Sequence, residues 1–196
     1  MSKDWIQGRL GGKVFPACLD PEQVELVDIA SGLCHESRFN GQYNHEDFYS
    51  VAEHCVWVSR VCDPKDAMAG LLHDASEAYL KDIPTPLKNL PDMSGYRRLE
   101  EEVTRTIYRR FGLVVPTMPD SVRDADAAML AVEVERFKAP VHPDWTLPEV
   151  KEYLRGRLPT KWQLGALPSR AYFLFMERFA ELVSKEEGGS YGIYKF

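Results

Sequence analysis

The feature that most constrains this fold is a small, apolar helical stretch that runs into two prolines. Residues 69–88 read AGLLHDASEAYLKDIPTPLK. We expect one helix over residues 64–80, with Pro64 in its first turn, because Pro84 and Pro86 do not allow the helix to continue. Its apolar residues are small, so we expect this helix in or beside the core.

Other segments also have helical spacing. Residues 50–62, SVAEHCVWVSRVC, begin with Ser50 and Glu53 as a capping box and place valines along one stripe. Further helices are expected over roughly 95–111, 120–138 and 169–185, with a short one after the proline-rich connection 140–148. Strand patterns are nearly absent. The sequence predicts an all-α fold, a single-domain helical bundle over residues 1–187, followed by a C-terminal tail over residues 188–196.

Composition narrows the class of protein. A chain of 196 residues with 44% hydrophobic content can bury one core. Its net charge of −6 argues against a nucleic-acid or anionic-membrane partner. The start, MSKDWIQGRLGG, lacks an apolar signal region, and no run has transmembrane length. The four cysteines form no C-x-x-C pair, which is typical of reduced thiols. We expect a cytoplasmic protein, in the host cytoplasm if a phage encodes it.

The polar residues of the apolar helix require an explanation. His73 and Asp74 are adjacent, and Glu77 follows one turn later on the same face. Taken alone, the His–Asp pair is weak evidence, because such a dipeptide is usually a capped or hydrogen-bonded surface pair. A buried carboxylate without a cation would cost several kcal/mol. His54 and Asp126 also lie in apolar helical segments. Two imidazoles and two carboxylates suit a divalent transition metal. We therefore expect a metal site made from three helices.

The motifs SVAEH, LLHDASE followed by DIPTPLK, and RDADA occur in this order. Together they resemble the HD-domain phosphohydrolase superfamily, whose ligand pattern is H…HD…D on an all-α scaffold. The resemblance runs from about residue 8 to residue 135. It is strongest to the 5′-deoxynucleotidase group and its short phage-type relatives, which include dATP triphosphohydrolases. The resemblance implies a metal-dependent hydrolase of deoxynucleoside phosphates.

The resemblance also implies a role for each motif residue. Glu77 is similar to the general acid/base of the family, and Asp82 to the acid that positions substrate and water. Glu77 could instead be an exposed helix residue, and Asp82 could cap the turn before Pro84. The cofactor would be a divalent ion (Co, Mn, Zn or Mg). The sequence does not decide whether a second ion binds together with a triphosphate. The implied metal ligands are His54, His73, Asp74 and Asp126.

Substrate contacts come from the same comparison. Arg38 resembles an arginine that precedes an aromatic residue in the family, and a guanidinium suits bidentate phosphate binding. Phe39 takes the aromatic place, where many relatives have Trp, and would stack on the sugar or base. The other implied contacts are Lys88 and Arg123 for the phosphates, and Gly41 and Pro86 for a purine pocket.

The motifs do not decide between triphosphate and monophosphate substrates. We expect a dNTP triphosphohydrolase that cuts at the α-phosphorus of a purine dNTP such as dATP, because residues 8–16 and 28–39 resemble the compact phage-type enzymes. A 5′-deoxynucleotidase acting on dNMPs is the alternative. An HD enzyme for cyclic nucleotides or (p)ppGpp, and an inactive nucleotide-binding module, are further alternatives. The resemblance also implies a homo-oligomer, a dimer or a hexamer.

Overall fold

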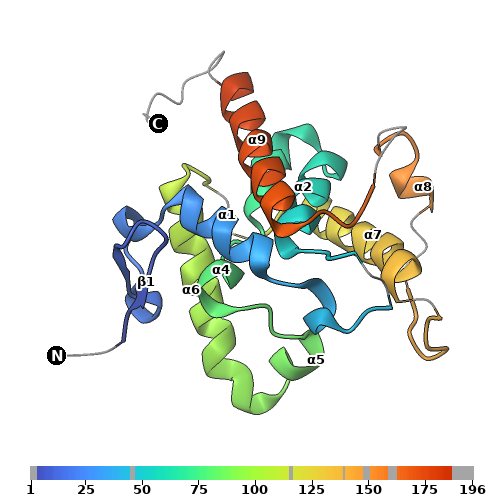
Figure 1. Cartoon of the computed structure of the whole chain (residues 1–196), viewed down its shortest axis with the longest axis horizontal. Coiled ribbons are helices and arrows are strands. Elements are labelled where there is room, and N and C mark those ends of the chain that lie inside the picture. Colours follow the sequence, from blue (N-terminus) through green and yellow to red (C-terminus); the bar gives the residue numbers. More distant parts are fainter. Residues whose placement is uncertain are drawn as a thin grey trace.

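The computed structural model describes residues 4–44, 47–114, 117–138, 140–147, 151–158 and 163–186, and over this range the chain is all-α, as the sequence predicts (Figure 1). The tail, residues 188–196, lies outside the described residues. An antiparallel pair of short strands pairs Ile6 with Val14 near the N-terminus. The elements are β1 (Ile6–Gln7), β2 (Lys13–Val14), η1 (Pro16–Cys18), η2 (Pro21–Gln23), α1 (Leu26–His35), η3 (Arg38–Gly41), α2 (Val51–Val61), η4 (Pro64–Asp66), α3 (Ala67–Leu72), α4 (Glu77–Leu80), α5 (Thr85–Lys88), η5 (Pro91–Met93), α6 (Ser94–Arg110), α7 (Asp120–Phe137), α8 (Lys151–Leu154) and α9 (Pro168–Glu186).

Helix α2 is the centre of the fold. All of its residues except Trp57 and Arg60 are buried. It packs against α1, α3, α7 and α9, which surround it, with α9 crossing near it in Figure 1. The sequence predicted only an apolar stripe along this helix. Contact with four neighbouring helices instead buries α2 almost all round, so any polar side chain on it needs a partner inside the protein.

The N-terminus of α2 has one of the two hydrogen bonds of the predicted capping box. The Ser50 hydroxyl accepts a hydrogen bond from the Glu53 backbone N–H at 3.2 Å, as predicted. The Glu53 carboxylate does not return to residue 50. It accepts the backbone N–H groups of Gly165 and Ala166 at 3.1 and 2.7 Å, and so ties the segment before α9 to α2. A tertiary contact therefore replaces half of the predicted capping box.

The expectation of one helix over residues 64–80 is wrong. The segment consists of η4, α3 and α4, with a turn over residues 73–76 between the last two. The imidazole Nδ1 of His73 donates to the Gly70 carbonyl at 2.8 Å. In a continuous α-helix the Asp74 N–H would use that carbonyl. The turn instead closes with three-residue bonds, from Ala75 N–H to the Leu72 carbonyl at 3.1 Å and from Glu77 N–H to the Asp74 carbonyl at 3.0 Å.

Two glycines allow helices to approach closely near this turn. A Cβ on Gly70 would lie 2.9 Å from the Cys62 sulfur and 3.1 Å from the Ser59 Cα, so α3 lies directly against α2. A Cβ on Gly32 of α1 would lie 2.8 Å from the Ala78 Cβ of α4. Both contacts fix the position of the chain on either side of residues 73–76.

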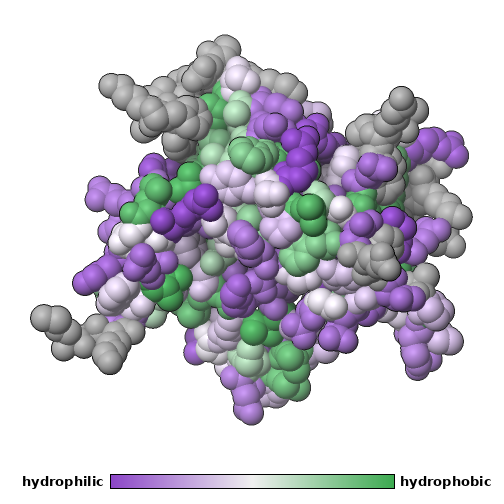
Figure 2. Space-filling view, viewed as in Figure 1, coloured by the Kyte–Doolittle hydropathy of each residue, from purple (hydrophilic) through white to green (hydrophobic). Residues whose placement is uncertain are grey.

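The surface carries a mixture of polar and apolar side chains. On the face drawn in Figure 2, hydrophilic atoms predominate, and apolar atoms gather near the lower end, in the region where Figure 1 draws α5. Leu87 and Leu90 are about half exposed there. Within the described residues, no helix has both the length and the apolar character needed to cross a membrane.

Replacement of a helical glycine by alanine normally stabilises a helix, but the close approach at Gly32 predicts the opposite effect there. We expect Gly32→Ala to lower the free energy of unfolding by about 1–3 kcal/mol, because the methyl group would overlap Ala78. Gly95→Ala in α6 is the matched control, because only Arg98 lies near its Cβ position, at 3.8 Å. It should gain up to about 1 kcal/mol from helix propensity. Urea denaturation of both variants measures the difference, and equal midpoints would contradict the packing described here.

Candidate metal centre

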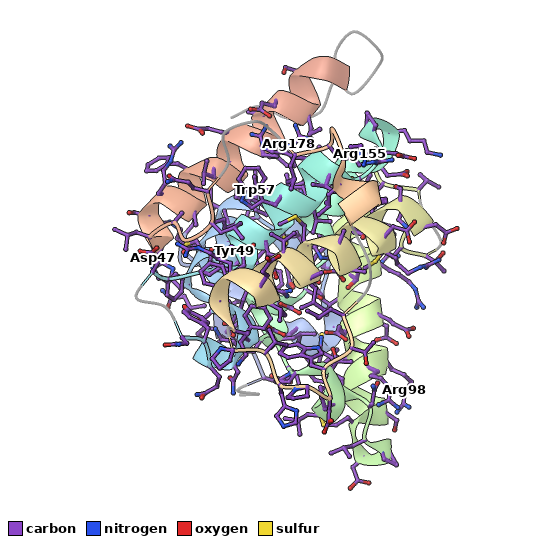
Figure 3. All side chains as sticks on the ribbon, turned by 90° about the vertical axis from the view of Figure 1, so that its right-hand side faces the viewer. Asp47, Tyr49, Trp57, Arg98, Arg155 and Arg178 are labelled. Atoms are coloured by element: carbon purple, nitrogen blue, oxygen red, sulfur yellow. The ribbon has the colours of Figure 1, made fainter. Side chains whose placement is uncertain are left out.

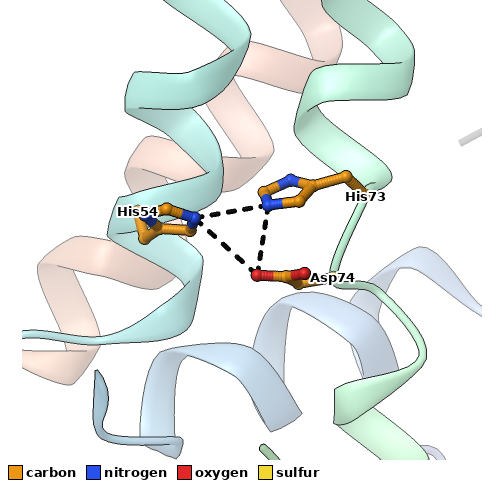
Figure 4. A group of neighbouring side chains, drawn as sticks. All are labelled: His54, His73 and Asp74. Carbon is orange, nitrogen blue, oxygen red and sulfur yellow. Dashed lines mark hydrogen bonds and ion pairs between the residues drawn. The ribbon is translucent and has the colours of Figure 1, made fainter. Parts of the chain in front are cut away.

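Three of the predicted metal ligands meet inside the protein (Figure 4). His54 comes from α2, and His73 and Asp74 come from the turn between α3 and α4. The Nε2 atoms of the two histidines are 3.3 Å apart, and Oδ2 of Asp74 lies 3.7 Å from His54 Nε2 and 3.1 Å from His73 Nε2. In the part of the chain that the structure describes, these three residues form a group whose ligand atoms all lie within 4.8 Å of one another, and the group could hold a metal ion.

Hydrogen bonds behind the imidazoles direct their free nitrogens to one point. His54 Nδ1 lies 2.6 Å from Glu133 Oε1, and His73 Nδ1 lies 2.8 Å from the Gly70 carbonyl oxygen. A carboxylate and a carbonyl both accept hydrogen, so each imidazole carries its proton on Nδ1 and turns a lone pair outward at Nε2. Two such lone pairs repel each other unless a cation lies between them. Donor atoms bound to one ion at about 2.1 Å lie roughly 3.0–3.4 Å apart, which is close to the spacing here.

The electrostatics of the group favour a cation. Burial lowers the pKa of the His54 imidazole, but the Glu133 carboxylate helps to reverse this, and the net pKa is raised. Burial also lowers the pKa of His73, yet the charge of Asp74 raises it well above its usual value. Burial raises the pKa of the Asp74 carboxyl, but the neighbouring imidazoles hold it well below its usual range. The protein thus stabilises positive charge at the point where the three side chains meet.

Asp126, the fourth predicted ligand, lies beside His54. Its Oδ1 is 3.2 Å from His54 Nε2, and its side chain is 42% exposed. Burial raises the pKa of this carboxyl, but the contact with His54 and the charges of His54 and His73 act together to lower it below its usual value. Asp126 adjoins one nitrogen of the compact group without belonging to it, so its role as a fourth ligand stays a prediction.

The two predicted catalytic carboxyls lie beyond the turn. Glu77 is 4% exposed, its Oε1 lies 3.6 Å from Lys88 Nζ, and its Oε2 is buried with no hydrogen-bond partner among the described residues. Burial, and then the charges of Asp74 and Asp82, raise the pKa of Glu77 well above its usual value. Burial also raises the pKa of Asp82. A carboxyl with a raised pKa keeps its proton more readily, which suits a group that gives and takes a proton in a reaction.

Lys88 lines a cavity of about 460 Å³ together with two residues of the metal group, His73 and Asp74. Lys88 lies at the end of α5, with its Nζ 2.6 Å from Glu100 Oε1 on α6. The cavity therefore joins the predicted metal ligands to a predicted phosphate-binding cation. Its lining includes His73, Asp74, Ser76, Lys88, Glu100 and Tyr108.

Arg38 lies between the metal group and Glu133 of α7. Its NH2 donates to Glu133 Oε2 at 3.2 Å, and its NH1 is 3.9 Å from Asp74 Oδ2. Its Nε is buried and has no hydrogen-bond partner among the described residues. Phe39 and the next residue, Asn40, both have φ of 55°, a left-handed backbone that is uncommon outside glycine and that turns the chain directly after Arg38. The Phe39 ring packs edge-on against Trp145, with centroids 6.5 Å apart.

The other three predicted substrate residues lie further from the group. Gly41 lines a separate cavity of about 330 Å³ with residues 42–44, Lys138 and Pro140. Pro86 is exposed in α5. Arg123 is exposed near the start of α7, where its guanidinium binds Asp120 and the Met118 carbonyl. Their contacts with a substrate stay predictions.

The sequence analysis missed Glu133. This residue is fully buried on α7, two helical turns after Asp126, and it binds both His54 and Arg38. Burial raises the pKa of Glu133, but the charges of His54 and Arg38 lower it to about 2. A glutamate between two valines, in the run AVEVERF, was the available signal, because such a position on a core helix needs a cationic or donor partner.

Comparison with known proteins finds relatives over most of the chain. No protein-family profile matches it. The chain is 36% identical to the uncharacterized protein YfdR of Escherichia coli K12 over 167 residues, which is 84% of this chain and 87% of YfdR. It is also 36% identical to an uncharacterized protein of Rhodobacter capsulatus over 147 residues, which is 70% of this chain and 74% of that relative.

The geometry predicts that metal binding depends on the turn residues. His73→Ala and Asp74→Asn should each abolish retention of Mn²⁺ or Co²⁺, because the first removes one of the three donor atoms that meet and the second removes the negative charge of another. Metal content by elemental analysis and affinity by calorimetry measure the loss. His35→Ala and Asp92→Asn, at exposed positions, are the matched controls and should retain the metal. Full occupancy in the His73 and Asp74 variants would refute the assignment.

Proposed function

The chain belongs to the same family as YfdR of Escherichia coli, and we propose that it is a metal-dependent phosphohydrolase of the HD-domain type that acts on deoxynucleoside phosphates. The observation that carries the proposal is the meeting of His54, His73 and Asp74 donor atoms at one point. Two imidazoles favour a transition ion such as Mn²⁺, Co²⁺ or Zn²⁺ over Mg²⁺, which prefers oxygen ligands. When bound, such an ion polarises a phosphoryl oxygen and lowers the pKa of a neighbouring water.

Residues around the group would bind the phosphate. Arg38 keeps its Nε–H free while Glu133 holds its NH2, so one donor of a rigid guanidinium is available for a phosphoryl oxygen. Lys88 lines the cavity beside His73 and Asp74 and supplies a second cation. Both side chains lie near Asp74 and would bind the oxygens of a phosphate chain.

Glu77 would transfer the proton. Its Oε2 has no hydrogen-bond partner among the described residues, and its raised pKa favours the protonated form. In the proposed reaction, the oxygen of water bonds to the α-phosphorus, and the bond from phosphorus to the 5′ oxygen breaks. Glu77 gives its proton to the 5′ oxygen and recovers one that the water loses. The products are deoxynucleoside and the released phosphate chain, and Asp82 would orient the water.

The proposed substrate is a purine dNTP, with dATP first, and the product would be intact triphosphate. This choice depends on the resemblance to the compact phage-type enzymes. The same resemblance underlies the expectation of a homo-oligomer. An assay of all four dNTPs and dNMPs with Co²⁺, Mn²⁺, Mg²⁺ and Zn²⁺ tests the proposal, and hydrolysis of none of them would refute it.

Replacement of Glu77 should separate catalysis from binding. Glu77→Gln keeps the size of the side chain but removes the exchangeable proton, so we expect kcat to fall by roughly 10²–10⁴-fold. Metal affinity should stay within a factor of about 2. Glu177→Gln, an exposed glutamate of α9, is the matched control and should leave kcat unchanged. A rise in KM alone would make Glu77 a binding residue and Asp82 the stronger candidate for the acid.

The products distinguish the two substrate classes. We expect dATP to yield tripolyphosphate and deoxyadenosine without a diphosphate intermediate, as resolved by ion-exchange chromatography and phosphorus NMR. Lys88→Glu should weaken dNTP hydrolysis more than dNMP hydrolysis, because the outer phosphates lose a cation. Arg123→Glu should have a smaller effect, since Asp120 and the Met118 carbonyl already bind its guanidinium. Preference of the unmodified protein for dNMPs, or equal losses on both substrates, would favour a 5′-deoxynucleotidase.

A further inference from the structure

A single buried carboxylate connects the two sides of the candidate site. Glu133 of α7 is 0% exposed, and its two oxygens accept hydrogen bonds from three different side chains. Oε1 accepts from the Tyr49 hydroxyl at 2.7 Å and from His54 Nδ1 at 2.6 Å, while Oε2 accepts from Arg38 NH2 at 3.2 Å. A group that is buried at this depth and fully bonded has a fixed position.

The Oε1 side fixes the metal ligand. With its Nδ1–H bound to Glu133, the His54 ring cannot rotate or change tautomer without breaking a charge-assisted bond, so its Nε2 lone pair stays directed at His73 and Asp74. Tyr49 holds the same oxygen from behind. Its ring is stacked on Phe137 with centroids 4.7 Å apart, and it lies inside the protein in Figure 3. The hydrogen bond from Tyr49, whose ring is itself held against Phe137, prevents the Glu133 carboxylate from moving away from His54.

The Oε2 side fixes the cation. Arg38 lies between two carboxylates, with NH2 on Glu133 and NH1 3.9 Å from Asp74 Oδ2. If Glu133 lost its charge, the nearest remaining anion for the guanidinium would be Asp74, which is itself a donor of the metal group. Glu133 therefore shares the guanidinium with Asp74 and fixes its NH2 end, while the buried Nε–H has no hydrogen-bond partner among the described residues.

We propose that Glu133 is a positioning residue that sets two functions of the site together: it orients His54 for the metal and Arg38 for the phosphate. This inference rests on the proposed phosphohydrolase activity. It predicts that one substitution impairs both metal affinity and substrate affinity, although Glu133 itself touches neither ligand.

Glu133→Gln is the direct test, because the amide keeps the shape but cannot accept hydrogen bonds on both sides. We expect Mn²⁺ affinity, measured by calorimetry, to fall about 10–100-fold. At saturating Mn²⁺, we expect KM for dATP to rise about tenfold or more, because Arg38 loses a charge-assisted bond. If Glu133 acted only on His54, excess Mn²⁺ would restore full activity and KM for dATP would not change, which would contradict the proposed role toward Arg38. Glu135→Gln, an exposed neighbour on α7, is the matched control.

A second variant decides the matter if the glutamine variant does not fold, as judged by circular dichroism. Glu133→Asp keeps the charge, but its side chain is one methylene shorter and cannot reach His54 and Arg38 together. It should therefore weaken at least one of the two affinities. Glu133 variants that fold and match Glu135→Gln in both Mn²⁺ affinity and KM would overturn the inference. Failure of the unmodified protein to bind Mn²⁺ would instead refute the proposed function.

Discussion

The rest of the site depends on two imidazole nitrogens, Nε2 of His54 and Nε2 of His73, which face each other at 3.3 Å. Each carries a lone pair, because the other nitrogen of each ring, Nδ1, keeps its proton and donates it in a hydrogen bond to Glu133 or to the Gly70 carbonyl. In a buried place, such a pair is stable only with positive charge between the rings, and Asp74 supplies the matching anion. The metal group is built around this contact, and the buried carboxylate of Glu133 lies behind one of its two rings.

The fold supports that contact by bringing backbones close. Gly70 lets α3 lie against α2, so that His73 can reach His54 across the interface. Over residues 73–76 the α-helical hydrogen bonds give way to three-residue bonds, and in this turn Asp74 lies beside both rings. On the opposite side, α7 presents Asp126 and Glu133 to the same histidine, one to each ring nitrogen. His54 is therefore held by side chains from two directions, which a site on a single helix could not provide.

Residue type and local surroundings were sufficient to find the centre of the site. His54, His73 and Asp74 are polar residues in apolar helical segments, so a compensating ligand could be inferred from the sequence before the segments were placed in space. Glu133 was not found in the same way. A glutamate in a helix is ordinarily solvated, and its burial here depends on how α7 packs on α2, a contact between segments 79 positions apart. The partner of Arg38 was unpredictable for the same reason.

The sequence by itself determined that the chain is helical, roughly where α2, α6, α7 and α9 begin and end, and that His54, His73 and Asp74 are polar side chains in apolar helical segments, because helical spacing, capping residues and prolines act over a few positions. Only the tertiary structure decided that residues 64–80 are broken at the metal group, since the His73 side chain takes the Gly70 carbonyl. It also decided that Glu53 binds residues 165 and 166 rather than completing its own cap. Both differences have one cause. A polar side chain can bond to a backbone group nearby in the sequence or to a distant one, and which bond forms depends on which helices pack together.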